Sequence, residues 1–283
     1  KGESDVEAIT RAIEGLPCLV SDVKESERQV KPKPPFTTSK LQQTAANRLG
    51  FTSKKTMQIA QQLYEGINIG STRIGLITYM RTDSVRVSDV ALKEVRDWLG
   101  ERFPAELPAE PVVYATDKKA QDAHEAIRPT MVAYTPDAIK EYLNKDQQKL
   151  YGIIWERFVA SQMTQAKQRS TSMEVSVGLA RFRVGASRLV EKGFYKVIKL
   201  LATKDDKEST LPEMRIGEEL KLEGYRPEQH FTQGPARFTD ASIIKLLEEK
   251  GIGRPSTYAP IISVLLERYY VTRENKQLVP TTL

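Results

Sequence analysis

The chain has 283 residues, 40% apolar and 28% charged, which is typical of a globular protein with room for two or three domains. It has no run of 18 apolar residues and no signal-peptide pattern, and its single cysteine, Cys18, excludes an internal disulfide and a cysteine-rich zinc site. A net charge of +6, from 43 Lys and Arg against 37 Asp and Glu, favours a polyanionic partner without identifying it.

The first 35 residues predict a helix followed by a strand. Ser4 and Glu7 form a capping box for a short helix that closes at Gly15. Residues 16–23 read as a strand, and residues 24–35 carry charges and prolines that suit an edge strand running into a hinge. The opening Lys-Gly-Glu is typical of mid-chain sequence, so we expect a fragment of a longer protein.

Residues 36–165 predict a mainly helical block. Ser39 with Gln42 forms a capping box for a helix ending at Gly50, and Thr52 or Ser53 caps a second helix ending at Gly66. Two helices joined by a glycine turn form a helix-turn-helix-like unit. Residues 67–74 are expected to be a loop, and further helices are expected after Ser88, from Thr135-Pro136 and through residues 150–158.

The period then changes from helical to alternating. Strands are predicted at residues 171–177, 182–184, 194–197 and 220–222, which together indicate an antiparallel β domain. The strand within residues 16–30 is expected to join this sheet, so that the helical block is an insertion into the β domain.

The last segment predicts a winged-helix-like unit. Thr239 caps a helix that ends at Gly251, a second helix follows residues 253–257, and a hairpin turns at Glu274-Asn275. The predicted fold is therefore an α+β multidomain protein: a β-rich domain (1–35 and 166–235), a mainly helical, helix-turn-helix-like domain (36–165) and part of a winged-helix-like helical domain (236–283).

The strongest chemical signal is the run Gly-Leu-Ile-Thr-Tyr-Met-Arg-Thr-Asp-Ser at residues 75–84. Residues 75–79 suit a short strand and the residues after them suit a turn, a place where catalytic side chains are often mounted. A neutral phenol is a poor nucleophile, but Arg81 could stabilise a phenolate and hold a phosphate oxygen at once. We therefore expect Tyr79 to attack a phosphodiester. The alternative is that Tyr79, one of eleven tyrosines, is merely packed at a strand end.

Histidine is scarce, with only His124 and His230 in the chain, which excludes a histidine-rich metal site. His124 and Arg128 are four residues apart and would share one face of a helix as a phosphate-binding pair. A solvated, salt-bridged turn explains the same spacing equally well. His230 has no local partners of this kind and is expected to be structural.

Residues 251–257 (Gly-Ile-Gly-Arg-Pro-Ser-Thr) place backbone N–H groups, hydroxyls and Arg254 at a helix start, which is a natural anion site. An ordinary, well-capped helix start is the alternative. The chain contains no Gly-x-x-x-x-Gly-Lys-Ser/Thr motif, so no ATP site is predicted, and it contains no aspartate-rich metal cluster.

Together these motifs resemble the bacterial type IA DNA topoisomerases. The similar stretches are Pro-Phe-Thr-Thr-Ser at 35–39, Ala-Gln-Gln-Leu-Tyr-Glu-Gly at 60–66, residues 75–84, Ala-His-Glu-Ala-Ile-Arg-Pro at 123–129, Pro-Ala-Arg-Phe at 235–238 and residues 251–258. They follow the family's order, and Ile-Thr-Tyr-Met-Arg-Thr-Asp-Ser is very specific.

The resemblance implies that residues 1–35 and 166–235 form a β-rich arch, that the helical domain 36–165 bears the nucleophile, and that residues 236–283 are part of a helical DNA-binding domain. It also implies a role for each motif. Tyr79 would form a 5′-phosphotyrosyl link to single-stranded DNA, Arg81 would aid cleavage, and His124 would be the active-site histidine. The resemblance implies that Glu65 and Asp83 are polar residues of the active site, that Arg254 and Thr257 contact DNA, and that Arg268 and Tyr269 lie beside another contact. With the phosphate-binding candidates named above, the expected DNA-binding residues are Arg81, Asp83, Glu65, Arg128, Arg254, Ser256, Thr257, Arg268 and Tyr269. Strand passage that relaxes negative supercoils would need no ATP, because the phosphotyrosyl ester preserves the bond energy.

The sequence also departs from the family pattern. Nothing resembles the toprim domain, whose acidic cluster binds Mg²⁺ in the family, or the carboxy-terminal zinc-ribbon region. We expect a central fragment that holds no metal itself, is inactive in relaxation alone, and has negatively supercoiled DNA and the missing domains as partners in the bacterial cytoplasm, with no membrane contact.

Two other functions fit part of the sequence. A non-enzymatic winged-helix DNA-binding protein would explain residues 239–280. A tyrosine recombinase or type IB topoisomerase also combines arginine, histidine and tyrosine, but its tyrosine follows a His-x-x-Arg motif. Here Tyr79 precedes His124, and the spacing to Arg128 is one residue longer. A covalent DNA adduct that is lost in Tyr79→Phe would exclude the non-enzymatic binder, and a 3′-linked adduct would indicate the recombinase or type IB class instead of a type IA enzyme.

Overall fold

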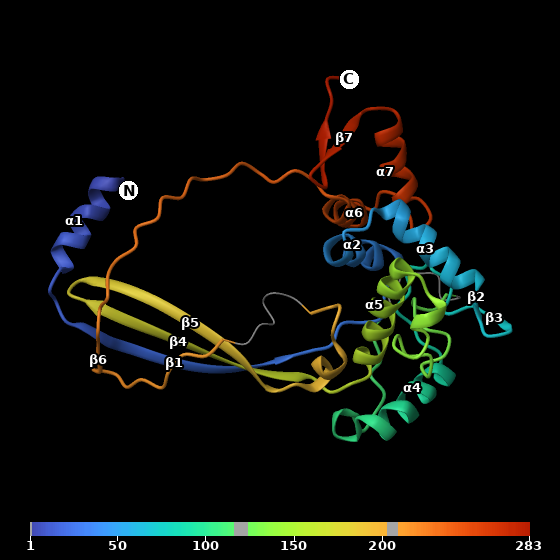
Figure 1. Cartoon of the computed structure of the whole chain (residues 1–283), viewed down its shortest axis with the longest axis horizontal. Coiled ribbons are helices and arrows are strands. Elements are labelled where there is room, and N and C mark those ends of the chain that lie inside the picture. Colours follow the sequence, from blue (N-terminus) through green and yellow to red (C-terminus); the bar gives the residue numbers. More distant parts are fainter. Residues whose placement is uncertain (1, 116–123, 203–208) are drawn as a thin grey trace. The chain divides into compact units, whose positions relative to one another are not determined.

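The computed structural model describes residues 2–115, 124–202 and 209–283. The chain forms two compact units (Figure 1). Unit 1 comprises Lys1–Val30, Gln165–Lys192 and Thr203–Gly234, and unit 2 comprises Lys31–Thr164, Gly193–Ala202 and Pro235–Leu283. Residues 193–202, which fall within the predicted arch, therefore belong to unit 2, and the division into three domains stays a prediction.

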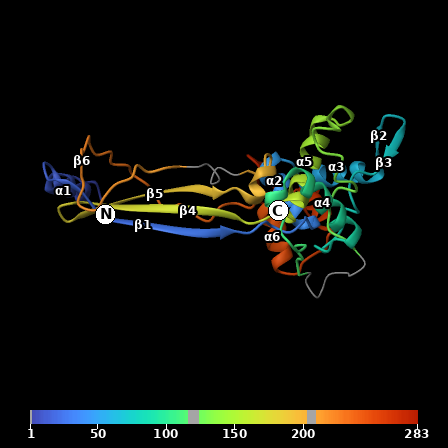
Figure 2. The same cartoon turned by 90° about the horizontal axis from the view of Figure 1, so that it is seen from below.

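Unit 1 is built on an antiparallel sheet with the strand order β5-β4-β1-β6. The strands are β1 (Cys18–Val30), β4 (Ala166–Val177), β5 (Ala180–Glu191) and β6 (Glu219–Leu220). β1 pairs with β4 from Cys18↔Val177 to Val30↔Ala166, so the predicted pairing across the helical block is confirmed. Figure 2 shows β1, β4 and β5 side by side along their length.

The hydrophobic core of unit 1 lies where helix α1 (Glu3–Ile13) meets the sheet. Ile13 packs there with Val20 and Val175 of the two paired strands, and Cys18 is buried among them as a free thiol. Helix α1 begins one residue earlier than the predicted cap, because the Asp5 carboxylate accepts the Gly2 N–H at 3.0 Å.

Unit 2 begins with the two predicted helices, α2 (Thr38–Leu49) and α3 (Ser53–Glu65). The cap of α2 is Thr37 rather than Ser39, because the Thr37 hydroxyl accepts the Lys40 N–H. Gly50 adopts a left-handed conformation at φ +67° and ends α2, and Thr52 caps α3. The ends predicted for the two helices, at Gly50 and Gly66, agree with the structure.

The centre of unit 2 is α5 (Lys145–Ser161), whose residues are almost all buried from Leu150 onwards. The helix packs against α2, α3 and the short 3₁₀ helix η3 (Gly193–Val197). Asn144 caps its start by accepting the N–H groups of Asp146 and Gln147. A fourth helix, α4 (Asp89–Arg102), begins after Ser88 as predicted and is followed by η1 (Pro104–Glu106).

Unit 2 differs from the predicted local structure at residues 67–74, at the Thr135-Pro136 step and at residues 194–197. Residues 67–74 form a hairpin of β2 (Ile67–Ile69) and β3 (Thr72–Ile74) instead of a loop, and Gly70 turns it at φ +61°. The Thr135-Pro136 step begins turns that lead to a 3₁₀ helix, η2 (Lys140–Tyr142), instead of an α-helix. Residues 194–197 lie in η3 instead of a strand.

The final segment of unit 2 has the predicted order of elements. Helices α6 (Asp240–Glu249) and α7 (Tyr258–Glu267) precede a hairpin of β7 (Val271–Glu274) and β8 (Gln277–Pro280). The hairpin turns at Asn275 and Lys276, both with positive φ. Ile244 and Ile262 form a small core between the two helices, and α6 packs on α2.

Candidate active site around Tyr79

Residues 75–84 form an irregular segment with bends at Thr78 and Met80 instead of a strand end, and their one β-bridge, an isolated one, joins Ile77 to Pro129. From residue 79 onwards the exposure of the side chains alternates: those at 80, 82 and 84 are buried, and the exposed ones are Tyr79, Arg81 and Asp83. A phenol, a guanidinium and a carboxylate are thereby exposed within five residues of one segment.

The buried side of this segment is fixed by Thr38, at the start of α2. The Thr38 hydroxyl donates to the Met80 carbonyl at 2.7 Å and accepts the Thr82 N–H at 2.8 Å. The Thr38 N–H donates to the Thr82 carbonyl at 2.9 Å. The backbone on either side of Arg81 is therefore held by one fully buried threonine.

Thr78 fixes the other side of Tyr79 by pairing with residues 126–128. Its N–H donates to the Arg128 carbonyl at 2.9 Å, and its hydroxyl donates to the Ala126 carbonyl at 2.7 Å and accepts the Arg128 N–H at 3.0 Å. Residues 124–128 are therefore not helical, and the predicted helical face shared by His124 and Arg128 is wrong. Of the motif at residues 123–129, Ala123 lies outside the described part of the chain.

Two rings lie beside the Tyr79 ring, which is 41% exposed: His124, from the segment that pairs with Thr78, and Tyr64, from α3. The His124 ring lies 5.9 Å from the Tyr79 ring, centroid to centroid, and the Tyr64 ring lies 5.4 Å from it at an interplanar angle of 66°. Edge-to-face contacts of this kind restrain a ring without covering it. Tyr64 was not among the predicted site residues, although it stands inside the Ala-Gln-Gln-Leu-Tyr-Glu-Gly motif.

Arg81 borders an open groove of about 1020 Å³ between α3 and α7. Within the described ranges, no carboxylate lies within ion-pair distance of Arg81. Its guanidinium is exposed and available to a ligand. Glu65 is also exposed and accepts a hydrogen bond of 2.5 Å from Gln61, which lines the same groove.

Phosphate binding would favour an arginine without a carboxylate partner, but Arg128 is paired with Glu125. Its Nε and Nη2 atoms both donate to Glu125 Oε2, at 3.0 and 2.6 Å, and its Nη1 donates to the Pro129 carbonyl. The two side chains are only 12% and 19% exposed. Burial raises the pKa of Glu125, but a Ser88 hydrogen bond and the Arg128 charge outweigh it and lower that pKa below its ordinary value of 4.5.

Residues 251–257 form the tight turn that precedes α7. The Thr257 hydroxyl accepts the Arg254 N–H at 2.8 Å, and Arg254 Nη1 donates to the Gly253 carbonyl. Arg254, Ser256 and Thr257 are all exposed. Burial and then the Glu248 charge raise the pKa of Tyr258, and Asp83 contributes to the same shift, so the start of α7 is within electrostatic reach of Asp83.

Arg268 and Tyr269 lie at the opposite end of α7 from Arg254. The helix has ten residues, which separates its two ends by about 15 Å. Both side chains are exposed, and Tyr269 adopts φ +56°. The structure brings the His124 ring to Tyr79 and exposes Arg81 and Asp83 on the same segment, and it places Arg268 and Tyr269 at a distance along α7 from Arg254.

Metal ligands are not grouped in the part of the chain that the structure describes. Across residues 2–115, 124–202 and 209–283, no three His, Cys, Asp or Glu side chains are placed to hold a metal ion. The residues present do not fit a Mg²⁺ site, and we derive no step through a metal from them. Over the same residues, no helix is long and apolar enough to span a membrane.

The family model described as DNA topoisomerase matches residues 1–283. The chain belongs to this family. It is 61% identical over 264 residues to DNA topoisomerase 1 of Treponema pallidum and 45% identical over 264 residues to that of Campylobacter jejuni, each time across 93% of the chain. The predicted membership in the bacterial type IA DNA topoisomerases is confirmed.

The solved structures support the same conclusion. Full-length topoisomerase I from Thermotoga maritima matches 99% of the chain with a TM-score of 0.82 and 39% identity. The mixed fold of helices and antiparallel sheet is thereby confirmed. The chain spans 36% and 37% of the two curated relatives and 45% of the Thermotoga protein, so it corresponds to a part of each.

Proposed function

We propose that this chain is the tyrosine-bearing part of a type IA topoisomerase and that Tyr79 is the nucleophile. The observation that carries the proposal is the exposed Tyr79 ring beside His124, with Arg81 exposed two residues farther along the same hydrogen-bonded segment. Attack by the phenolic oxygen on a phosphodiester forms an O–P bond to the 5′ phosphate. The bond from phosphorus to the 3′ oxygen breaks, the phenolic proton leaves, and the 3′ oxygen leaves as a hydroxyl after taking up a proton.

Arg81 and His124 would stabilise the charge that develops in this step. An arginine without a carboxylate partner can hold a non-bridging phosphate oxygen through charge-assisted hydrogen bonds. His124 contacts the Tyr79 ring and lies close enough to donate to the same phosphate once DNA is bound. The reverse reaction restores the phosphodiester, so strand passage down a supercoiling gradient requires no ATP.

Single-stranded DNA is the proposed substrate at the cleavage step. The groove between α3 and α7 begins at Arg81, and the turn at residues 251–257 offers Arg254, Ser256 and Thr257 as exposed phosphate contacts. We place Glu65 and Asp83 beside the bound strand as polar contacts. Arg268 and Tyr269 would reach it farther along α7, and Arg128 would act by holding residues 124–129 through Glu125.

We assign the remaining half of the active site to other parts of the parent protein. In this proposal its toprim domain supplies Mg²⁺ and its carboxy-terminal region adds DNA contacts, within the bacterial cytoplasm and at the nucleoid. The isolated 283-residue chain then retains at most weak binding to single strands.

A plasmid relaxation assay tests the proposal. The parent protein is expected to relax negatively supercoiled plasmid without ATP, and Tyr79→Phe is expected to abolish relaxation while leaving binding of single-stranded DNA intact. The isolated chain is expected to be inactive. Relaxation by the isolated chain, or by Tyr79→Phe, would contradict the proposal, and DNA binding without any change in linking number would favour a winged-helix binding protein.

A further inference from the structure

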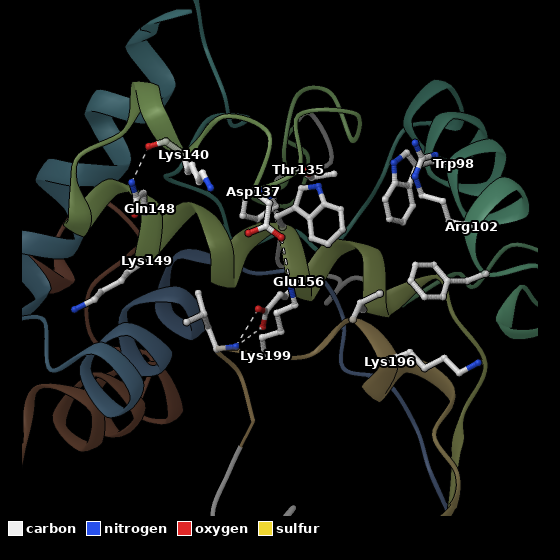
Figure 3. Close-up of a pocket in the computed structure, with 15 residues that line it drawn as sticks. Trp98, Arg102, Thr135, Asp137, Lys140, Gln148, Lys149, Glu156, Lys196 and Lys199 are labelled. Carbon is white, nitrogen blue, oxygen red and sulfur yellow. Dashed lines mark hydrogen bonds and ion pairs between the residues drawn. The ribbon is translucent and has the colours of Figure 1, made fainter.

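Unit 2 contains a second concave site, formed by residues that the Tyr79 site does not use. This cavity has a volume of about 570 Å³, within the range of about 300–1,000 Å³ that is usual for ligand sites. Its walls come from α4, the turn at residues 135–137, η2, α5 and the segment from η3 to Leu200. Figure 3 shows this cavity with its lining residues.

The floor of the cavity is aromatic. The rings of Trp98 and Trp155 meet edge to face, with centroids 5.2 Å apart and an interplanar angle of 83°, and Phe103 packs against Trp98 at 6.0 Å. Trp155 donates to the Val132 carbonyl at 3.0 Å. Trp98 Nε1 is buried and has no hydrogen-bond partner among the described residues. The floor is thus an apolar surface with one unused donor.

The wall opposite the aromatic floor is fixed by a buried carboxylate. Glu156 is 4% exposed and accepts the N–H groups of Leu200 and Leu201 at 2.9 to 3.0 Å. Burial raises the pKa of Glu156, and these backbone donors oppose the rise. Leu200 also lies so close to Gly152 of α5 that an added Cβ there would approach its Cδ1 atom to 2.6 Å. The backbone hydrogen bonds and the contact with Gly152 therefore hold Leu200 in a defined position at the edge of the cavity.

The rim of the cavity is basic. Five lining residues are cationic and two are acidic, and the cationic ones are Arg102, Lys140, Lys149, Lys196 and Lys199. Lys196 is paired with Glu106, and Lys199 with Asp137. Within the described part of the chain, Lys140 and Lys149 have no carboxylate at ion-pair distance. Figure 3 shows these two lysines on one side of the cavity and Lys196 on the other.

We propose that this cavity docks an acidic peptide segment of a partner protein. An apolar side chain of the peptide enters between Trp98, Phe103 and Leu200, and carboxylates on either side of it pair with Lys140 and Lys149. The apolar floor accounts for the anchor, and the unpaired lysines account for the acidic flanks by charge complementarity.

The ring geometry favours a peptide over a nucleobase. A stacked base needs a free aromatic face. The Arg102 guanidinium covers a face of Trp98 at 4.8 Å from the ring centroid, and Trp155 is only 6% exposed. The cations are distributed around an apolar centre and do not converge on one point, as they would around a phosphate group.

Binding of a labelled peptide to the 283-residue chain tests the proposal. The probe is a fluorescein-labelled dodecapeptide with one central Phe flanked by Asp and Glu, followed by fluorescence polarisation. The unlabelled peptide is expected to change the intrinsic emission as well, because both tryptophans of the chain line the cavity. Replacing the peptide's Phe with Ala is expected to abolish saturable binding.

Paired charge reversals locate the site. Lys140→Glu with Lys149→Glu is expected to weaken the Kd by about tenfold or more, since two attractions become repulsions. The matched control, Lys93→Glu with Lys145→Glu, changes the same net charge on exposed lysines outside the cavity and should leave the Kd unchanged. Circular dichroism confirms that all variants fold.

Three results would overturn the proposal. One is the absence of saturable binding to the wild-type chain, and another is an equal loss in the control variant. The third is displacement of the peptide by a twelve-nucleotide oligothymidylate whose own affinity falls with the Lys140 and Lys149 reversals, which would assign the cavity to nucleic acid. None of these readouts depends on DNA cleavage, so they leave the role of Tyr79 untouched.

Discussion

Thr38 and Thr82 are joined by reciprocal hydrogen bonds: the Thr38 hydroxyl accepts the Thr82 N–H at 2.8 Å, and the Thr38 N–H donates to the Thr82 carbonyl at 2.9 Å. The first turn of α2 is thereby bonded to the backbone that carries Arg81. Both threonine side chains are buried, so this contact holds the backbone of residues 80–82, from which the Arg81 side chain is exposed.

Replacing Thr38 with Val tests this support. The isosteric valine leaves the Thr82 N–H and the Met80 carbonyl without a partner in a buried site, which should cost about 1–3 kcal/mol of unfolding free energy. Urea unfolding followed by tryptophan fluorescence measures the loss, because both tryptophans lie in unit 2. Thr38→Ser keeps the hydroxyl and serves as the control. Equal stability of the Val and Ser variants would contradict this account.

Tyr64 is expected to restrain the Tyr79 ring through its edge-to-face contact. Aromatic pairs of this kind contribute about 0.5–1.5 kcal/mol, so Tyr64→Ala should slow DNA cleavage by the parent protein by roughly twofold to tenfold. Tyr64→Phe keeps the ring and should cleave at the wild-type rate. A loss in the Phe variant as large as in the Ala variant would assign the effect to the hydroxyl instead.

The Glu125–Arg128 pair predicts a pH dependence of stability. The pKa of Glu125 is lower in the folded chain than its ordinary value of 4.5. Its contribution to the free energy of unfolding is therefore fully present above pH 4.5 and is lost as the pH falls through the pKa of the folded chain. Glu125→Gln should therefore unfold more easily than wild type at pH 7, by about 1–2 kcal/mol for a mostly buried pair. The difference should close below pH 4.5 in urea titrations. A constant difference down to acid pH would contradict the pairing.

Asp240 is expected to hold α6 to the start of α3. Its Oδ2 atom accepts the Ser53 N–H at 2.8 Å and its Oδ1 atom accepts Arg273 Nη2 at 2.6 Å, while the side chain is 7% exposed. Asp240→Ala should lower the unfolding free energy by about 2–3 kcal/mol, since it strands a buried donor and a charge. Asp137→Ala removes an exposed pair with Lys199 and should change nothing measurable in the same urea titration.

The sequence predicted the elements that have strong local signals. Helices α2 and α3 end at Gly50 and Gly66 as expected, a helix covers residues 150–158 as expected, and the alternation in β1 and β4 indicated a shared sheet. The β2–β3 hairpin had a signal that the loop assignment overlooked: residues 67–74 alternate around a Gly-Ser turn.

The arrangement of the site depends on long-range backbone pairing, which the spacing of residues in the sequence does not reveal. His124 reaches Tyr79 because Thr78 takes its hydrogen-bond partners from residues 126–128, almost fifty positions away. A four-residue spacing between His124 and Arg128 suggested a helix, but the segment that makes these long-range bonds is not helical. Local patterns could place Arg81 beside Tyr79, whereas the Tyr64 and His124 rings required the fold.

The central claim is that Tyr79 forms the covalent link to DNA. The most direct measurement is recovery of the covalent complex between the parent protein and single-stranded DNA labelled separately at each end, followed by peptide mapping. The account predicts a 5′-phosphotyrosyl adduct on Tyr79 and none in Tyr79→Phe. An adduct of 3′ polarity, or one that persists in the Phe variant, would contradict it.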